Sequence, residues 1–268
     1  MKLSPIIGAG VALALAACNG DFLTAKGDSY TDAVQQADAA RKAGDLNSAI
    51  PLYGRALQAN PQGTEAKLGL GQAYLSMGAG EEAAAAFREV LARHGGDSTA
   101  RLGLAAALLT QGQASLAEKQ AEMVLQGDSH EYHALNVMGV SLDMQGRNAE
   151  AQACYRQGMA LAADYLPLRS NLALSLAISG QPQEAISLLA PIAVGMAGDG
   201  RMRQNLAFAY AMAGDPTNAL QFARRDLDEA SAQQQLAYFL QLRSLPPELR
   251  SAELRRNPNF FPQPSHRT

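Results

Sequence analysis

The feature that most constrains this chain is an internal period of 34 residues. Glycine occurs six times at this interval, at Gly44, Gly78, Gly112, Gly146, Gly180 and Gly214. Alanine follows each glycine five residues later, at Ala49, Ala83, Ala117, Ala151, Ala185 and Ala219. No insertion shifts this register between Tyr30 and Gln233. A period of this length predicts an array of similar units, each of which buries its apolar face on its neighbours.

Each unit has the pattern of two helices joined at the glycine. Apolar residues recur at helical spacing on both sides, as at Leu172 and Leu176 before Gly180 and at Ala185 and Leu189 after it. Glycine can end the first helix in the left-handed conformation, and the small alanine lets the two helices approach closely. Apolar residues make up 47% of the chain, and alanine and leucine dominate them, which favours helices over strands.

The pattern resembles the tetratricopeptide repeat, a helical hairpin of 34 residues. The resemblance covers residues 30–233 and implies an all-α fold, a right-handed α-solenoid of about six helical hairpins with a C-terminal capping helix. Its units begin at Tyr30, Thr64, Ser98, Tyr132, Leu166 and Gly200. The sequence "GDS" at 27–29, 96–98 and 127–129 is expected to supply N-cap oxygens for the next first helix.

The chain departs from the repeat pattern at a few positions. The proline expected at the end of a second helix occurs only as Pro61, Ala121 replaces an aromatic residue, and Gly158 and Asp226 occupy a position usually held by another small residue. The carboxylate of Asp226 indicates that the array ends there. Residues 234–256 are then expected to form capping helices that place Leu236, Phe239 and Leu240 on the last hairpin, followed by a flexible Pro-rich tail at 257–268.

The N-terminus is typical of a bacterial lipoprotein. Lys2 precedes a short apolar run, too short to span a bilayer, so residues 1–17 are predicted to be a signal peptide. "LAAC" at 15–18 resembles a lipobox, which implies lipid attachment at Cys18. No cofactor is expected apart from this covalent lipid. Asn19, rather than aspartate, implies an outer-membrane anchor facing the periplasm, with residues 18–29 as a lipidated tether. A plain signal peptide is the alternative.

The repeat geometry implies a concave surface lined by the first helices. Near the start of the array this surface is expected to be polar, with Asp38, Arg41 and Lys42. Farther along it is expected to expose an apolar peptide-binding groove that could hold a helix or an extended segment. The predicted groove residues are Leu68, Leu75, Leu102, Leu109, Val140, Met144, Leu174, Ile178, Phe208 and Met212. The alternative is that some of them pack internally or against the cap.

Charge narrows the choice of partners. The net charge is −3, or about −4 once Lys2 leaves with the leader, which argues against nucleic acid. Repeats that clamp acidic peptide tails use lysines and asparagines in the groove. Units three to six contain one lysine, Lys119, in a second helix, so Asn171 and Asn205 are expected instead to bond the backbone between repeats.

No enzyme signature stands out, so a non-catalytic scaffold is expected. The chain has no P-loop and no nucleophile elbow, and "GLGQAY" at 69–74 lacks the third glycine of a dinucleotide loop. "DSHEYH" at 128–133 is the best metal candidate, but His130 and His133 lack helical zinc spacing, and a solvated loop explains them better. Cys154 has no intrachain partner and is expected to be a small buried apolar residue.

The lipobox, the alanine-rich repeats and "LRSLPPELRSAEL" at 242–254 together resemble the TadD family of tight-adherence (Flp) pilus-assembly lipoproteins. This resemblance implies a periplasmic adaptor for a type IVb pilus machine, with components such as the secretin as protein partners. Two alternatives stay open: a pilotin-like protein for another secretin or outer-membrane assembly complex, and a regulatory adaptor of cell-wall enzymes. Phe260 and Phe261 are either a docking motif or part of a frayed tail.

Overall fold

The computed structural model describes residues 29–193 and 199–256 of the 268, and in these ranges it contains fourteen α-helices and no strand. The first helices of the six units are α1 (Tyr30–Lys42), α3 (Thr64–Ser76), α5 (Ser98–Thr110), α7 (Tyr132–Met144), α9 (Leu166–Ile178) and α11 (Gly200–Ala213). The second helices are α2 (Leu46–Ala59), α4 (Gly80–Leu91), α6 (Ala114–Gly127), α8 (Asn148–Leu161), α10 (Pro182–Ala193) and α12 (Pro216–Ala223). The all-α fold is therefore confirmed, and each predicted unit begins on the first residue of a helix.

The repeated glycine forms the turn inside each hairpin. All six glycines have a positive φ, between 72° and 89°, as predicted. In unit three, the amide of Gln113, just after Gly112, donates to the carbonyl of Leu108 across 2.8 Å. This bond ties the turn back to the last turn of the first helix, which is the usual way in which a left-handed glycine ends a helix.

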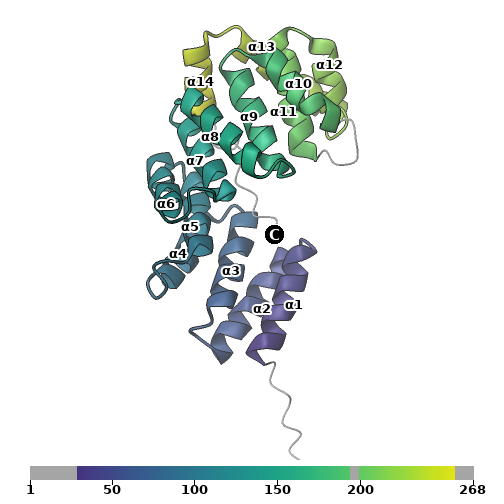
Figure 1. Ribbon diagram of the computed structural model, residues 1–268. Helices are drawn as coiled ribbons and strands as arrows, with labels where there is room; N and C mark the ends of the chain where they lie inside the picture. Colours follow the sequence, from purple (N-terminus) through teal and green to yellow (C-terminus); the bar gives the residue numbers. More distant parts are fainter. Residues whose placement is uncertain (1–28, 194–198, 257–268) are drawn as a thin grey trace, which may run out of the picture.

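The contacts between helices define an inner and an outer side of the stack (Figure 1). Each first helix packs on the first helix of the next unit, as in the pairs α5–α7, α7–α9 and α9–α11, whereas successive second helices make no comparable contact in the described residues. The first helices therefore lie closer together than the second helices. The stack curves with the first helices on its concave side.

Small side chains allow this close packing. A Cβ atom on Gly139 of α7 would lie 2.3 Å from the ring of Tyr155 in α8, so only glycine fits beneath that ring. The alanine column in the second helices is fully buried, with Ala49 and Ala185 both 0% exposed. Small residues in the first and second helices thus allow the two helices of a hairpin to pack closely.

The predicted N-caps are confirmed in two of three places. Ser29 accepts a hydrogen bond from the amide of Asp32, and Asp97 accepts one from Ala100. The prediction for 127–129 is wrong, because Asp128 bonds the amide of His130 in the connecting loop and Glu131 caps α7. The loop before α7 places Glu131, not Asp128, beside the first free amides.

The chain after Asp226 caps the last hairpin, as expected, although the first capping helix begins at Glu229 rather than at residue 234. Asp226 forms a bidentate ion pair with Arg203, with oxygen–nitrogen distances of 2.8 and 2.5 Å. Helix α13 (Glu229–Arg243) then packs on both α11 and α12, as a seventh first helix would. Phe239 stacks edge-on against Phe208 at 5.1 Å, and Leu236 is half-buried, but Leu240 is exposed. Leu242 takes the buried place that was predicted for Leu240.

The last helix, α14 (Pro247–Arg255), leaves the stack and turns back onto α9. Arg250 fixes it there. Its buried guanidinium donates to the carbonyls of Ile178 at the end of α9, of Leu242 in the last turn of α13 and of Leu245 just after α13, at 3.0 to 3.2 Å. The free carbonyls at a helix C-terminus attract cations, and the Arg250 side chain supplies hydrogen-bond donors to the C-termini of both α9 and α13.

The buried apolar residues fall into two clusters. The smaller cluster lies in α1, α2 and α3, around Tyr53 and Ala66. The larger cluster runs from Ala83 in α4 to Leu254 in α14. We call α1–α3 the first region and α4–α14 the second region.

Candidate functional site

One position in each first helix marks the centre of the concave side. The ring of Tyr155, from the second helix α8, covers α7 at Gly139, and the second helix α6 also packs on α7. At 100° per residue the next residue along, Val140, points away from the second helices. The equivalent residues, eight positions into each first helix, form what we call the inner row: Asp38, Gln72, Ala106, Val140, Leu174 and Phe208.

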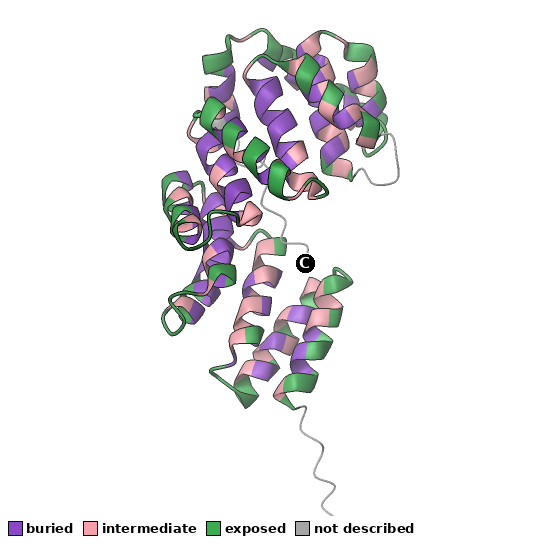
Figure 2. Ribbon diagram, viewed as in Figure 1, coloured by how far each residue is buried: buried purple, intermediate pink, exposed green. Residues whose placement is uncertain are grey.

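The inner row changes character along the stack. Asp38 and Gln72 in the first region are polar and half-buried. Ala106, Val140 and Leu174 in the second region are apolar and only 1 to 3% exposed. Figure 2 shows the same contrast, because α9 is buried along nearly its whole length while α1 carries many exposed residues. The concave surface is thus open and polar at the start and closed and apolar farther on.

The ten predicted groove residues all lie in first helices, but most of them are not exposed. Seven are buried: Leu102, Leu109, Val140, Leu174, Ile178, Phe208 and Met212. Three are half-buried: Leu68, Leu75 and Met144. The predicted exposure is therefore wrong for the first seven, since neighbouring helices such as α13 at Phe208 cover part of this surface. Peptide binding by these residues stays a prediction.

A polar cluster occupies the concave side of the first unit. The hydroxyl of Tyr53 in α2 donates to the carboxylate of Asp38, and Arg41 donates to the same hydroxyl across 3.2 Å. Burial, followed by the hydrogen bond to Asp38, raises the pKa of Tyr53 well above its usual value. Lys42 lies next to this cluster and is exposed. The predicted polar start of the concave surface is confirmed.

The two asparagines behave as predicted in part. Asn205 of α11 donates to the backbone carbonyl of Ser170 at 3.3 Å and to its hydroxyl at 2.9 Å. Asn171 of α9 bonds a side chain instead, the oxygen of Asn136 in α7, at 2.8 Å. Asn136 is completely buried, and its own amide nitrogen has no hydrogen-bond partner. An unpaired buried donor is unusual and requires an explanation.

A buried carboxylate that sequence reasoning missed joins units four and five. Asp143 of α7 accepts hydrogen bonds from Ser175 and Asn148 at 2.7 Å each and from Tyr155 at 3.0 Å. Burial raises the pKa of Asp143 to about 7, although these three donors oppose the shift. A cavity beside this network lies between the α7–α8 turn and α14, near Gly146.

Aromatic side chains cluster where α7 and α9 begin. The rings of Tyr132, His133 and Tyr165 lie 4.0 to 5.1 Å apart, and all three residues are half-buried. The nitrogen Nδ1 of His133 lies 2.7 Å from Glu131, whereas His130 is exposed and contacts Ser129. The two histidines of the metal candidate therefore have different partners, and no cluster of three ligand side chains occurs in the described ranges.

Of the two cysteines, Cys154 lies within the described residues. Cys154 in α8 is half-buried against the larger cluster, so it is less buried than predicted, and burial raises the pKa of its thiol. Cys18 and the predicted signal peptide lie outside the described residues. Among the helices that the structure describes, none combines the length and apolarity needed to cross a membrane.

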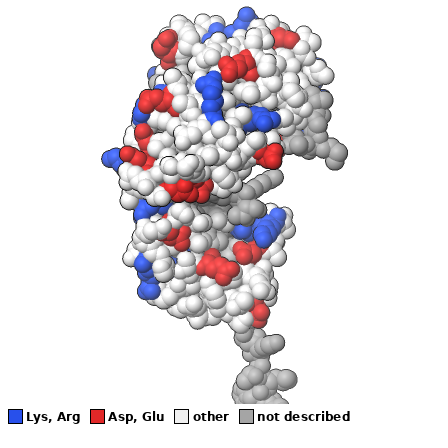
Figure 3. Space-filling model, viewed as in Figure 1, with Lys and Arg blue, Asp and Glu red and all other residues white. Residues whose placement is uncertain are grey.

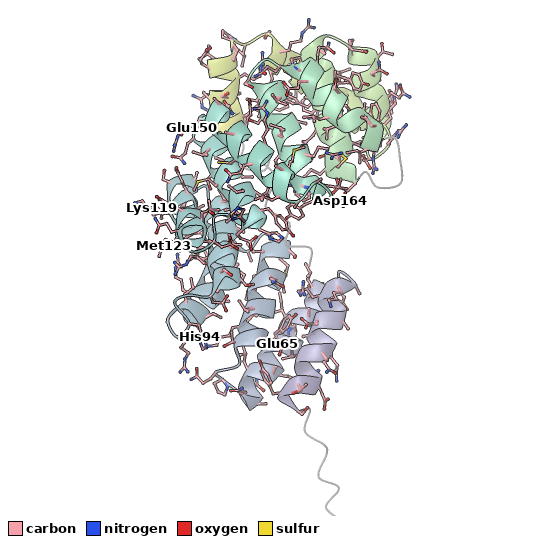
Figure 4. The ribbon with its side chains drawn as sticks, viewed as in Figure 1. Glu65, His94, Lys119, Met123, Glu150 and Asp164 are labelled. Carbon is pink, nitrogen blue, oxygen red and sulfur yellow. The ribbon has the colours of Figure 1, made fainter. Side chains whose placement is uncertain are left out.

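No region of a single charge sign stands out on the face that Figure 3 draws. Lysine and arginine alternate with aspartate and glutamate over the face drawn in Figure 3. Met123 of α6 is 48% exposed and, with Lys119, points away from the stack in Figure 4. Met123 on the outer side and Met144 on the inner side thus provide a matched pair of methionines.

Profiles of the tetratricopeptide repeat match residues 34–98 and 75–137 of the chain. The uncharacterised protein y4yS of Sinorhizobium fredii (strain NBRC 101917 / NGR234) is 34% identical over 99 residues. These residues make up 37% of this chain and 54% of that relative, so the chain matches about half of its length.

Solved structures show the same architecture. A tetratricopeptide repeat protein from Parabacteroides merdae ATCC 43184 has a TM-score of 0.69 at 13% identity and covers 81% of this chain and 86% of its own. Pseudomonas aeruginosa pilF has a TM-score of 0.59 at 15% identity, with coverage of 78% and 97%. At such identities the likeness shows the fold alone. Residues 34–137 therefore match the tetratricopeptide repeat, and the described residues have the fold of solved tetratricopeptide-repeat proteins.

Proposed function

We propose that this protein is a periplasmic scaffold, anchored to the outer membrane by lipid on Cys18, that assembles a tight-adherence (Flp) pilus machine by binding its protein components. The observation that carries the proposal is a curved stack whose concave side is lined by first helices and ends in the "LPPELR" segment held by Arg250. Tetratricopeptide-repeat proteins bind protein or peptide partners.

The half-buried part of the concave surface is the proposed binding surface. It comprises Leu68, Leu75 and Met144 of the predicted groove, with the aromatic cluster of Tyr132, His133 and Tyr165. Half-buried apolar and aromatic side chains can still contact a partner, and such residues commonly anchor interfaces. The secretin is the partner that we expect at this surface.

The binding surface is tested with the two methionines. Met144→Lys places a charge on the concave side, and Met123→Lys makes the same change on the outer side. In cells that carry the pilus machine, we expect the amount of secretin that co-purifies with Met144→Lys to fall at least about tenfold. The amount that co-purifies with Met123→Lys should not change. Equal co-purification would exclude this surface. Capture of a different secretin or a cell-wall enzyme would replace the pilus assignment.

The anchor is tested by Cys18→Ser. Without lipid the mature chain has no anchor, because acyl chains supply about 0.8 kcal/mol of membrane affinity per buried methylene. We expect this variant in the soluble periplasmic fraction and the parent protein in the outer membrane. A variant that still sediments with the membrane would contradict the lipid anchor.

A further inference from the structure

The centre of the concave side of the second region is buried, although no described helix crosses it. Helix α5 packs extensively on α3, α4, α6 and α7, and α7 packs on α5, α6, α8 and α9. These are neighbours within the stack, and among the described helices none lies across the inner side of α5 or α7. Yet Ala106 and Val140, at the centre of that side, are each 1% exposed.

The same surface holds a hydrogen-bond donor without a partner. Asn136 lies four residues before Val140, on the same side of α7, and its oxygen is taken by Asn171. Its amide nitrogen is fully buried and unpaired. A side-chain amide in an apolar groove is well suited to bond the backbone carbonyl of an extended peptide, because this contact does not depend on the peptide's side chains.

A segment of the same chain starts close to this surface. Arg250 fixes α14 to the end of α9, so the chain that follows Arg256 leaves from beside unit five. The five residues up to Phe261 can span roughly 17 Å when extended, about two spacings between packed helices. Phe260 and Phe261 can therefore reach α7 and α5.

The chemistry of this segment matches the surface. Residues 257–265, "NPNFFPQPS", carry no charge and include two phenylalanines and three prolines. The inner row of units three to six is apolar, and the nearby aromatic cluster suits proline rings, which dock on aromatic residues in other peptide sites.

We propose that residues 257–268 bind the concave surface of their own chain, with Phe260 and Phe261 on the inner row of units three to five. A partner that binds this surface would have to displace the tail. This inference rests on the proposal that the concave surface is a peptide site, and it adds the first occupant of that site.

A labelled synthetic peptide of residues 257–268 tests the proposal by fluorescence anisotropy. We compare the full-length protein with a variant that ends at Arg256. The peptide should bind the shortened chain at least about tenfold more tightly, because the tail leaves only a minor fraction of the full-length groove open. Met144→Lys should weaken binding to the shortened chain, and Met123→Lys should not.

Two further variants distinguish an effect on tail binding from an effect on the stability of the fold. A Phe260→Ala/Phe261→Ala peptide should bind at least about tenfold more weakly, since the rings supply most of its apolar area. The same double substitution in the full-length protein should open the groove to the wild-type peptide without any truncation. Unchanged thermal midpoints of these variants would show that the stack itself is intact.

Equal affinity of the peptide for both chain lengths, or no binding to the shortened chain, would overturn the proposal. A dimer in analytical ultracentrifugation that disappears with the tail would place the tail in a second copy and overturn the intrachain contact. If the tail peptide does not bind but Met144→Lys still abolishes secretin capture, only this inference is wrong. If the tail peptide binds but Met144→Lys leaves secretin capture unchanged, only the proposed function is wrong.

Discussion

The first and second regions are built on one template but present different concave surfaces. Both have the buried alanine column and the left-handed glycines, so their hairpins have the same geometry. The first region places Asp38 and Gln72 on the inner row and remains half-open there. The second region places Ala106, Val140, Leu174 and Phe208 there and is closed.

Different residues therefore determine the packing of the hairpins and the character of the concave surface. The residues that repeat most strictly hold each hairpin together, and they say little about binding. The inner row does not repeat in chemistry, and it decides whether a unit faces water or apolar groups. The separate apolar clusters further imply that the first region can loosen without the second.

Overpacking the alanine column should have the largest effect. Ala185→Leu inserts three carbon atoms at a fully buried site of the larger cluster and should lower overall stability by ~1–3 kcal/mol. Ala49→Leu is the matched change in the first region and should speed hydrogen exchange in residues 30–76 only. Chemical denaturation and exchange mass spectrometry measure the two effects. Faster exchange throughout 80–256 in Ala49→Leu would show that the regions are one unit.

Removing the guanidinium of Arg250 should have the next largest effect. Arg250→Met leaves buried carbonyls at two helix ends without a donor, at a cost of about 1–2 kcal/mol, and should release α14. Arg256→Met is the control, because Arg256 is exposed and pairs with Glu253 of the adjoining helix α14. Hydrogen exchange of residues 247–256 checks the release, while the first region should not change. Equal protection of α14 in both variants would contradict this role.

The pH dependence of stability should also differ between the regions. Burial raises the pKa of Asp143 to about 7, above its unfolded value near 3.9, so the folded state holds the proton more tightly. This contribution is complete below about pH 4 and is lost as the pH rises through 7. Between pH 5 and 8 the parent should lose on the order of 1 kcal/mol more stability than Asp143→Asn. Identical slopes for both proteins in urea titrations would contradict the assignment.

Local rules in the sequence accounted for the scaffold. The glycine column predicted each hairpin turn, and the start of each unit at residues such as Tyr30 and Gly200 was correct because helix boundaries follow the repeat. The cap at Glu131 and the buried Leu242 were missed. Both depend on the path of one loop or the rotation of one helix, which periodicity does not determine.

The concave surface could be predicted only in part. The helical period correctly placed Leu109 and Leu174 on first helices, but a period cannot tell what covers a surface. Asp143 was missed because its donors come from α8 and α9, far apart in sequence. Arg250 belonged to a segment used only for its resemblance, and its role depends on the end of α9, 72 residues away.

The concave side is open in the first region, at Gln72, and closed in the second region, at Ala106. Thiol labelling tests it directly, in chains that begin at residue 19 and carry Cys154→Ser together with either Gln72→Cys or Ala106→Cys. We predict that the thiol at position 106 reacts at least about 100-fold more slowly with a water-soluble disulfide reagent than the thiol at position 72. Equal reaction rates at the two positions would contradict the account.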